Sequence, residues 1–422
     1  MKKTLLSLAL AAVSVAASAQ TFNSIPWEVS PYLAGITISN NGKYIGGCDY
    51  TGIMFVADWA TQSVMTQDPP KDTDTGLIRA ISDDGVGVGF NGDAAVSLDM
   101  KGNYKVIYDG DGIATSITPD GKKICGVINT NTVPAACYWQ DDQLIMLPEA
   151  TDKWLGIKSY GTSAEYISDD GSVIAGHLID KLSTRPLIIW HLNKDGKTYS
   201  IDPTFKRFAK VKTSDGNGLM CYFTPTNMSG NGKWIALTVS TDNGIMTMGR
   251  YNVDTDELEV INCQDAVDAD FMCEASGISN DGTILGYYGD SEQGIRYGVI
   301  CKPGETEAVK LSAAFSGIQE LAHYDELKNN TPTDITPDGK YILGHSIDII
   351  DYYGEEAMVF ITYIIDVDGN SASVKSISRP VDKVVNGKEV YYTIDGKRIN
   401  PSAYKGLIIK KDANGNIKKF MK

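Results

Sequence analysis

Histidine is scarce in this chain, so each histidine is a candidate for acid–base or metal chemistry. The sequence contains four, and two of them, His177 and His345, directly follow a glycine in otherwise similar segments. An imidazole can exchange protons near neutral pH or bind a metal ion, so one hypothesis gives these two residues a shared role in ligand binding. Under the other hypothesis they fill space, because the matching positions elsewhere hold residues of unrelated chemistry: Cys48, Phe90, Val127, Thr238 and Tyr287.

A second candidate for binding is Trp154, which lies outside the pattern of strands described below. An exposed indole offers a flat apolar face on which a sugar ring or a partner's side chain can stack. The alternative is a loop residue that folds onto the edge of the protein. The candidate binding residues are therefore Trp154, His177 and His345.

The sequence contains none of the common catalytic motifs. It lacks the Gly-x-Ser-x-Gly nucleophile turn, the His-Glu-x-x-His zinc motif and a phosphate-binding loop. Paired carboxylates could hydrolyse a glycan, and the chain has 53 Asp and Glu residues, but their spacing selects no pair. We therefore assign no catalytic residue, metal or cofactor, and we expect recognition rather than catalysis.

An internal repeat supplies the elements that would position these residues. One pattern occurs seven times: an apolar residue, Ser or Thr, any residue, Asp or Asn, and Gly, followed by a short apolar strand. Asp-Gly and Asn-Gly tolerate the positive φ that a tight β-hairpin turn requires. The seven turn glycines, spaced 36–61 residues apart, are Gly42, Gly85, Gly121, Gly171, Gly232, Gly282 and Gly339.

Each copy of the repeat extends into a small antiparallel sheet. The strand after the turn carries a glycine in most copies, such as Gly126 and Gly176, which suits a close approach of two backbones. A further strand, often marked by an aromatic residue such as Trp139 or Trp190, follows 17–19 residues after the turn glycine, and an apolar strand closes the unit. Such sheets cannot bury their faces alone, so seven of them predict an all-β fold, a closed seven-bladed β-propeller.

Two longer gaps interrupt the repeat and predict insertions near residues 202–226 and 303–330. The second contains a helical pattern over residues 311–327. Such insertions either connect blades or line a ligand-binding face.

The repeated unit, Ile-Ser-x-Asp-Gly-x-x-Ile-x-Gly, resembles the HAF-type propeller repeats of extracellular bacterial proteins. It is also similar to the Ser-Pro-Asp-Gly-Lys units of TolB-type propellers. The resemblance covers roughly residues 30–378 through short motifs. It implies a propeller and is nearly silent on function, because propellers host many unrelated activities.

Both ends of the sequence carry segments that differ from the repeat. Lys2 and Lys3, an apolar run and small residues at 17–19 predict a signal peptide over residues 1–19. We then expect a propeller over residues 20–378 and a β-hairpin module over residues 379–422. That module resembles the C-terminal segments of secreted proteins of Bacteroidetes-type bacteria, some of which are sorting signals for type IX secretion. A small module that packs on the propeller is the alternative.

The charge distribution narrows the class of partner. The formal net charge is −15, and the last 44 residues are basic while the body is strongly acidic. An acidic body repels phosphate backbones and anionic lipids, so we expect no nucleic-acid partner, and no later segment is apolar enough to predict a membrane span. The predicted function is recognition or scaffolding at the cell envelope, periplasmic, outer-membrane-associated or extracellular, with a protein or glycan partner. The alternative is a glycan-acting enzyme with carboxylates at the propeller mouth.

Seven cysteines without a Cys-x-x-Cys motif do not indicate a disulfide framework. Cys125 and Cys137 flank a predicted hairpin and form the best candidate pair. Separate buried thiols are the alternative.

Overall fold

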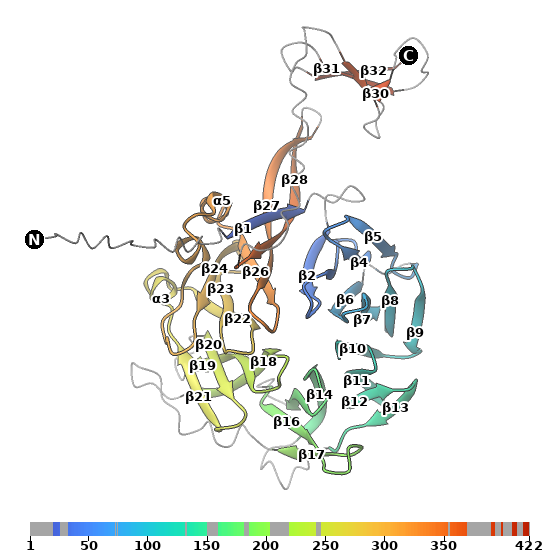
Figure 1. Cartoon of the computed structure of the whole chain (residues 1–422), viewed down its shortest axis with the longest axis vertical. Coiled ribbons are helices and arrows are strands. Elements are labelled where there is room, and N and C mark those ends of the chain that lie inside the picture. Colours follow the sequence, from blue (N-terminus) through green and yellow to red (C-terminus); the bar gives the residue numbers. More distant parts are fainter. Residues whose placement is uncertain are drawn as a thin grey trace, which may run out of the picture.

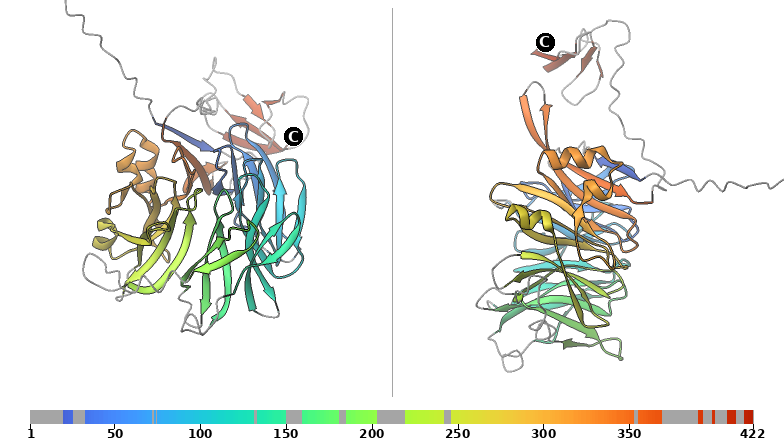
Figure 2. Two further views of the ribbon diagram at one scale, coloured as in Figure 1. Left: turned by 60° about the horizontal axis from the view of Figure 1, so that its bottom comes forward. Right: turned by 90° about the vertical axis from the view of Figure 1, so that its left-hand side faces the viewer.

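The chain folds into a ring of seven four-stranded antiparallel sheets (Figure 1). The computed structural model describes residues 20–25, 33–71, 73, 75–130, 133–149, 159–180, 185–202, 219–241, 246–352, 355–368, 390–392, 398–399, 407–411 and 417–421. The predicted all-β fold with a seven-bladed propeller is confirmed. Figure 2 shows the blades from two further directions.

Six blades are each built from four consecutive strands, with the innermost strand first. Blade 1 contains β2 (Ala34–Ile38), β3 (Tyr44–Cys48), β4 (Met54–Asp58) and β5 (Ser63–Gln67). Blade 2 contains β6 (Gly76–Ile81), β7 (Val86–Asn91), β8 (Ala94–Asp99) and β9 (Tyr104–Tyr108). Blade 3 contains β10 (Gly112–Ile117), β11 (Lys123–Thr130), β12 (Val133–Gln140) and β13 (Gln143–Met146).

The same order continues around the ring. Blade 4 contains β14 (Ser159–Ile167), β15 (Val173–Asp180), β16 (Leu187–Leu192) and β17 (Tyr199–Asp202). Blade 5 contains β18 (Leu219–Met228), β19 (Trp234–Thr241), β20 (Met246–Asn252) and β21 (Glu257–Ile261). Blade 6 contains β22 (Met272–Ile278), β23 (Ile284–Asp290), β24 (Ile295–Cys301) and β25 (Val309–Lys310).

Blade 7 closes the ring with strands that lie far apart in the sequence. Three of its strands are consecutive: β26 (Asn330–Ile335), β27 (Tyr341–Tyr352) and β28 (Glu355–Asp366). The fourth is β1 (Thr21–Ile25), which pairs antiparallel with β28 along its full length. The Phe22 ring of β1 stacks on Tyr363 of β28, with ring centroids 5.4 Å apart. The first strand of the propeller therefore holds its last blade in place.

The repeated turns lie between the first and second strand of each blade. All seven turn glycines have positive φ, from +68° to +90°, a region that residues with a Cβ enter only at a cost. In the first turn, the Ser39 hydroxyl donates to Asn41 Oδ1 and accepts from the N–H of Tyr44. The same bond from Ser or Thr to Asp or Asn recurs in five other blades. The recurring acidic residues are thus used inside the turns.

Apolar side chains from neighbouring blades form the core between the sheets. One cluster joins Tyr138 of blade 3, Trp190 of blade 4 and Tyr251 of blade 5. Trp190 is fully buried, and its indole N–H donates to the carbonyl of Pro148 at 2.9 Å. Burying a side chain of this size contributes roughly 2–3 kcal/mol. The aromatic marker of the third strand is therefore a residue of the core between blades.

Three short helices lie beside blade 6. They are α3 (Gln264–Ala269), α4 (Leu311–Ala314) and α5 (Gln319–Glu326). The single helical pattern expected over residues 311–327 is thus split into two helices, which pack Leu311, Phe315 and Leu321 into one cluster with blade 7. Most of the other expected insertion, residues 203–218, lies outside the described residues.

The C-terminal region contains a separate four-stranded sheet in the order β30-β29-β31-β32. Its strands are β29 (Val390–Tyr392), β30 (Arg398–Ile399), β31 (Leu407–Lys411) and β32 (Ile417–Met421). The predicted signal peptide over 1–19 and the predicted boundary at residue 378 lie outside the described residues. No helix in the described part of the chain is long and apolar enough to cross a membrane.

Cys125 and Cys137 are free, buried thiols on neighbouring strands of blade 3. Cys125 lies opposite Tyr138 and Cys137 opposite Gly126, so the two cysteines are offset by one position. Burial raises the pKa of the Cys125 thiol to about 12, which leaves little thiolate for exchange. The candidate disulfide is therefore absent between these two residues, and the buried-thiol alternative holds.

Candidate functional site

The innermost strand of every blade carries one β-bulge at the same position, six residues before the turn glycine. A bulge leaves one residue out of the strand ladder and redirects its side chain. Six of the seven bulged residues line a cavity of about 260 Å³ in the central channel, and six of the seven are polar. The bulged residues are Ile36, Arg79, Thr115, Glu165, Thr226, Ser276 and Thr333.

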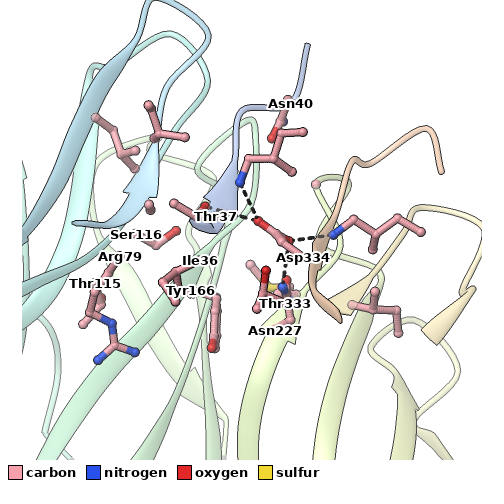
Figure 3. Close-up of a pocket in the computed structure, with 18 of the residues that line it drawn as sticks. Ile36, Thr37, Asn40, Arg79, Thr115, Ser116, Tyr166, Asn227, Thr333 and Asp334 are labelled. Carbon is pink, nitrogen blue, oxygen red and sulfur yellow. Dashed lines mark hydrogen bonds between the residues drawn. The ribbon is translucent and has the colours of Figure 1, made fainter. Parts of the chain in front are cut away.

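A buried carboxylate, Asp334, joins three blades within this channel (Figure 3). Its Oδ2 accepts hydrogen bonds from the Thr37 hydroxyl at 3.2 Å and the Ile38 N–H at 3.0 Å, both in blade 1. Its Oδ1 accepts from the Asn227 amide at 3.1 Å in blade 5 and from the N–H of Ile335 at 2.9 Å. Burial raises the pKa of Asp334 to about 6, and these four donors oppose that rise.

An ion pair links blades 2 and 4 at a second point. Arg79 Nη2 lies 3.3 Å from Glu165 Oε2, and the Ser163 hydroxyl donates to Glu165 Oε1 at 2.6 Å. His177 Nδ1 lies 3.5 Å from the same Oε1 without forming a hydrogen bond. Both oxygens of Glu165 are thus occupied by other residues of the protein.

The turns are tied together at one end of the channel. Backbone N–H groups donate to facing carbonyls between blades 2 and 3, 4 and 5, and 6 and 7, at 2.7–2.9 Å. Blade 1 is the odd member, and its Asn40 amide crosses to Asp169 Oδ1 of blade 4 at 2.6 Å. Four of the residues in these contacts, Asn40, Asp169, Gly230 and Pro337, also line the cavity. The residues in the ring of contacts are Asn40, Asp83, Pro119, Asp169, Gly230, Asn280 and Pro337.

Two residues before each bulge, towards the end of the channel opposite the turns, the blades differ in chemistry. Blades 1 to 3 pair Ala34 with Cys48, Leu77 with Phe90 and Ile113 with Val127 across their first two strands. Blades 4, 6 and 7 instead pair Ser163 with His177, Glu274 with Tyr287 and Thr331 with His345, and blade 5 has Thr238. We call these seven residues of blades 4 to 7 the polar crescent.

Both predicted histidines belong to the polar crescent, but the structure places them in different blades. His177 in blade 4 is 8% exposed, and burial lowers its pKa. His345 in blade 7 packs edge-on against Phe360, and burial lowers its pKa to about 4. No group of three or more His, Cys, Asp and Glu residues in the described part of the chain could hold a metal ion. Trp154 lies outside the described residues.

The motifs of the sequence indicated neither Asp334 nor the Arg79–Glu165 pair. A signal for Arg79 and Glu165 was present, because these bulged residues lie six positions before the turn glycines Gly85 and Gly171. A glycine in the second strand of the blade also indicates the bulge. In blade 4, a Cβ added to Gly176 would lie 2.0 Å from the carbonyl oxygen of Ser163, two residues before the bulged Glu165. Glycine within a strand often marks a bulge or a close backbone approach.

Comparisons with known proteins return structural similarities of low sequence identity. No family model and no curated protein sequence matches the chain. An oligogalacturonate lyase from Vibrio parahaemolyticus is 14% identical with a TM-score of 0.46, over 83% of this chain and 97% of that one. The β-propeller domain of Cps50 (Swd1) from Myceliophteria thermophila is 10% identical with a TM-score of 0.47, over 80% and 98%. TolB from Acinetobacter baumannii is 14% identical with a TM-score of 0.41, over 63% and 65%.

Proposed function

We propose that the protein is a non-catalytic recognition protein of the cell envelope, which binds a glycan or a protein partner at the channel end that carries the polar crescent. The observation that carries the proposal is a set of buried polar atoms. His177 Nδ1, Thr331 Oγ1 and His345 Nδ1 in the polar crescent, and Ser276 Oγ in the channel, have no hydrogen-bond partner among the described residues. Each such atom destabilises the fold by about 1–3 kcal/mol unless something satisfies it, and a polar ligand would do so.

The carboxylates near the channel support recognition over hydrolysis. A glycosidase needs one carboxyl group to donate a proton and another to act as base or nucleophile. Asp334 accepts four hydrogen bonds from the protein, and Glu165 is held by Ser163 and Arg79. Either group would have to break bonds that join blades before it could react with a substrate.

The test compares binding by the chain of residues 20–422 with binding by a variant whose channel is filled. We expect Ser276→Phe to weaken binding about tenfold or more, since the ring would occupy the cavity. Ser200→Phe, on the exposed outer strand of blade 4, is the matched control and should bind as the parent does. Calorimetry with a glycan panel and pull-down from envelope extracts are the two readouts, and the melting temperature of each variant checks folding.

The same samples separate the alternative, a glycan-acting enzyme. Each glycan is incubated with the protein and its chain length is followed by chromatography. A glycan that stays intact while bound agrees with recognition. A glycan that is shortened, and is left intact by Glu165→Gln or Asp334→Asn, would replace the proposed function with catalysis by these carboxylates.

A further inference from the structure

A groove of about 270 Å³ lies between blades 3 and 4, beside the polar crescent. One wall is apolar and half-buried, and it is formed by Ile113 and Val127 of blade 3 and Ile179 of blade 4. The lining also contains polar side chains, which include Asn129, His177 and Arg185. A concave surface that combines an apolar wall with a few placed polar groups is typical of a small-molecule site.

The charges around this groove balance. Arg185 lines it, and Arg79, which lines the central cavity, neutralises Glu165 through their ion pair. Glu165 and Asp111 supply two negative charges on the same surface, and Asp111 accepts a hydrogen bond from the Asn129 amide. An anionic ligand would meet these carboxylates and a cationic ligand would meet the guanidinium groups. The balance therefore selects a ligand without net charge.

The groove also offers both kinds of hydrogen-bonding group. Arg185 carries N–H donors, whereas Asp111 carries a second carboxylate oxygen beside the one that accepts from the Asn129 amide. His177 adds a ring whose buried Nδ1 faces Glu165 at 3.5 Å, and since burial lowers its pKa the ring is neutral at pH 7. A neutral imidazole has one donor and one acceptor. A ligand that itself donates and accepts at neighbouring atoms would match this lining.

We infer that the groove between blades 3 and 4 is a subsite for the end of an uncharged saccharide. Sugar hydroxyl groups both donate and accept, which suits the mixed lining, and the C–H face of the ring suits the wall of Ile113, Val127 and Ile179. The inference rests on the proposed recognition function and selects glycan over protein as its ligand class. It also gives His177 a role in contact with the ligand.

The test measures binding of three neutral hexasaccharides, cellohexaose, laminarihexaose and mannohexaose, by calorimetry at low and high salt. An acidic oligogalacturonate hexamer and a cationic chitosan hexamer serve as charged probes. We expect one neutral hexasaccharide to bind the chain of residues 20–422 with an affinity that changes little with salt, because no net charge is neutralised. A charged hexamer that binds more tightly than every neutral one would overturn the inference.

Two variants place the ligand in the groove. Val127→Trp fills it and Arg185→Ala removes an exposed donor, and each should weaken binding about tenfold or more. The matched controls are Val106→Trp on the outer strand of blade 2 and Lys194→Ala on an exposed turn of blade 4, which should bind as the parent does. Arg185 is exposed, so its variant should fold even if Val127→Trp does not.

The outcomes separate this inference from the function on which it rests. Parent-like binding of a neutral hexasaccharide by both groove variants would move the subsite elsewhere and leave recognition intact. No binding of any hexasaccharide, together with a protein captured from envelope extracts, would overturn the subsite and leave a protein partner. No binding in either assay would overturn both.

Discussion

The titration of Asp334 gives a testable prediction for a single residue. Its pKa is about 6 in the folded protein against the ordinary aspartate value of 3.8, because it is buried. A raised carboxyl pKa means that the folded state binds the proton more tightly, so stability falls as pH rises from about 4 to about 6. The shift corresponds to roughly 3 kcal/mol of stability present at low pH and lost above pH 6.

The Asp334→Asn variant isolates this contribution. Asparagine does not ionise, so the stability difference between parent and variant should shrink by roughly 3 kcal/mol between pH 4 and pH 7.5. Urea denaturation at the two pH values measures it, and other titrating groups cancel in the difference. A pH-independent difference would show that Asp334 has an ordinary pKa in the fold.

For single residues, the sequence indicated which residues form the turns but not which distant residues bond to one another. The turn residues could be assigned because their bonds are local: Ser39 and Asn41 are two residues apart. Asp334 could not, because its donors lie 296 residues away in Ile38 and 107 residues away in Asn227. Those contacts exist only once the ring is closed. Its neighbours Pro332 and Thr333 carry no local signal that the carboxylate will be buried.

The bulge and the glycine opposite it give a prediction for an element. A Cβ at position 176 would lie 2.0 Å from the Ser163 carbonyl oxygen and 2.9 Å from Trp190, so the backbone of the inner strand must move and the indole with it. We expect Gly176→Ala to lower the free energy of unfolding by about 1–3 kcal/mol, as is usual for overpacking in a core.

The matched control is Gly317→Ala, between α4 and α5. A Cβ there would contact nothing within 4 Å, so this variant should be neutral or slightly stabilised by reduced freedom of the unfolded chain. Urea denaturation of both variants provides the comparison. Equal stability of the two would mean that the inner strand of blade 4 shifts without cost and that the bulge does not require glycine.

At the element scale, the repeat predicted strands better than it predicted their irregularities. Period and turn chemistry located the hairpins because both are written in neighbouring residues. The split of the 311–327 pattern into two helices depends on packing of Phe315 and Leu321 against blade 7. Strand glycines such as Gly176 indicated the bulges. The side chain that each bulge redirects is known only from the register of the folded sheet.

At the scale of the whole molecule, the sequence predicted a closed ring but not which strand closes it. β1 has five residues and no turn motif, and it pairs with β28 across more than 330 positions. No local pattern marks such a strand, although the seven complete turns already implied seven sheets. Its pairing with β28 gives blade 7 its fourth strand. We therefore expect this pairing to determine the stability of the closed ring.

This closure predicts that a few N-terminal residues control the stability of the entire propeller. Ile25 is 2% exposed and packs in the cluster that contains Ile45 and Ile364, whereas Ser24 beside it is exposed. Ile25→Asp would bury a charge or expel β1 from blade 7, so we expect a loss of about 3 kcal/mol or more. Ser24→Asp adds the same charge at the surface and should change stability by less than about 0.5 kcal/mol.

Scanning calorimetry of both variants, and of a chain that begins at residue 26, tests whether β1 stabilises the closed ring. If β1 closes the ring, Ile25→Asp and the shortened chain should both melt earlier, because blade 7 then presents an open edge beside Tyr363. The shortened chain should also unfold less cooperatively, since each blade is held only by its neighbours. A shortened chain that melts with the parent would show that three strands suffice for blade 7 and that β1 adds nothing to closure.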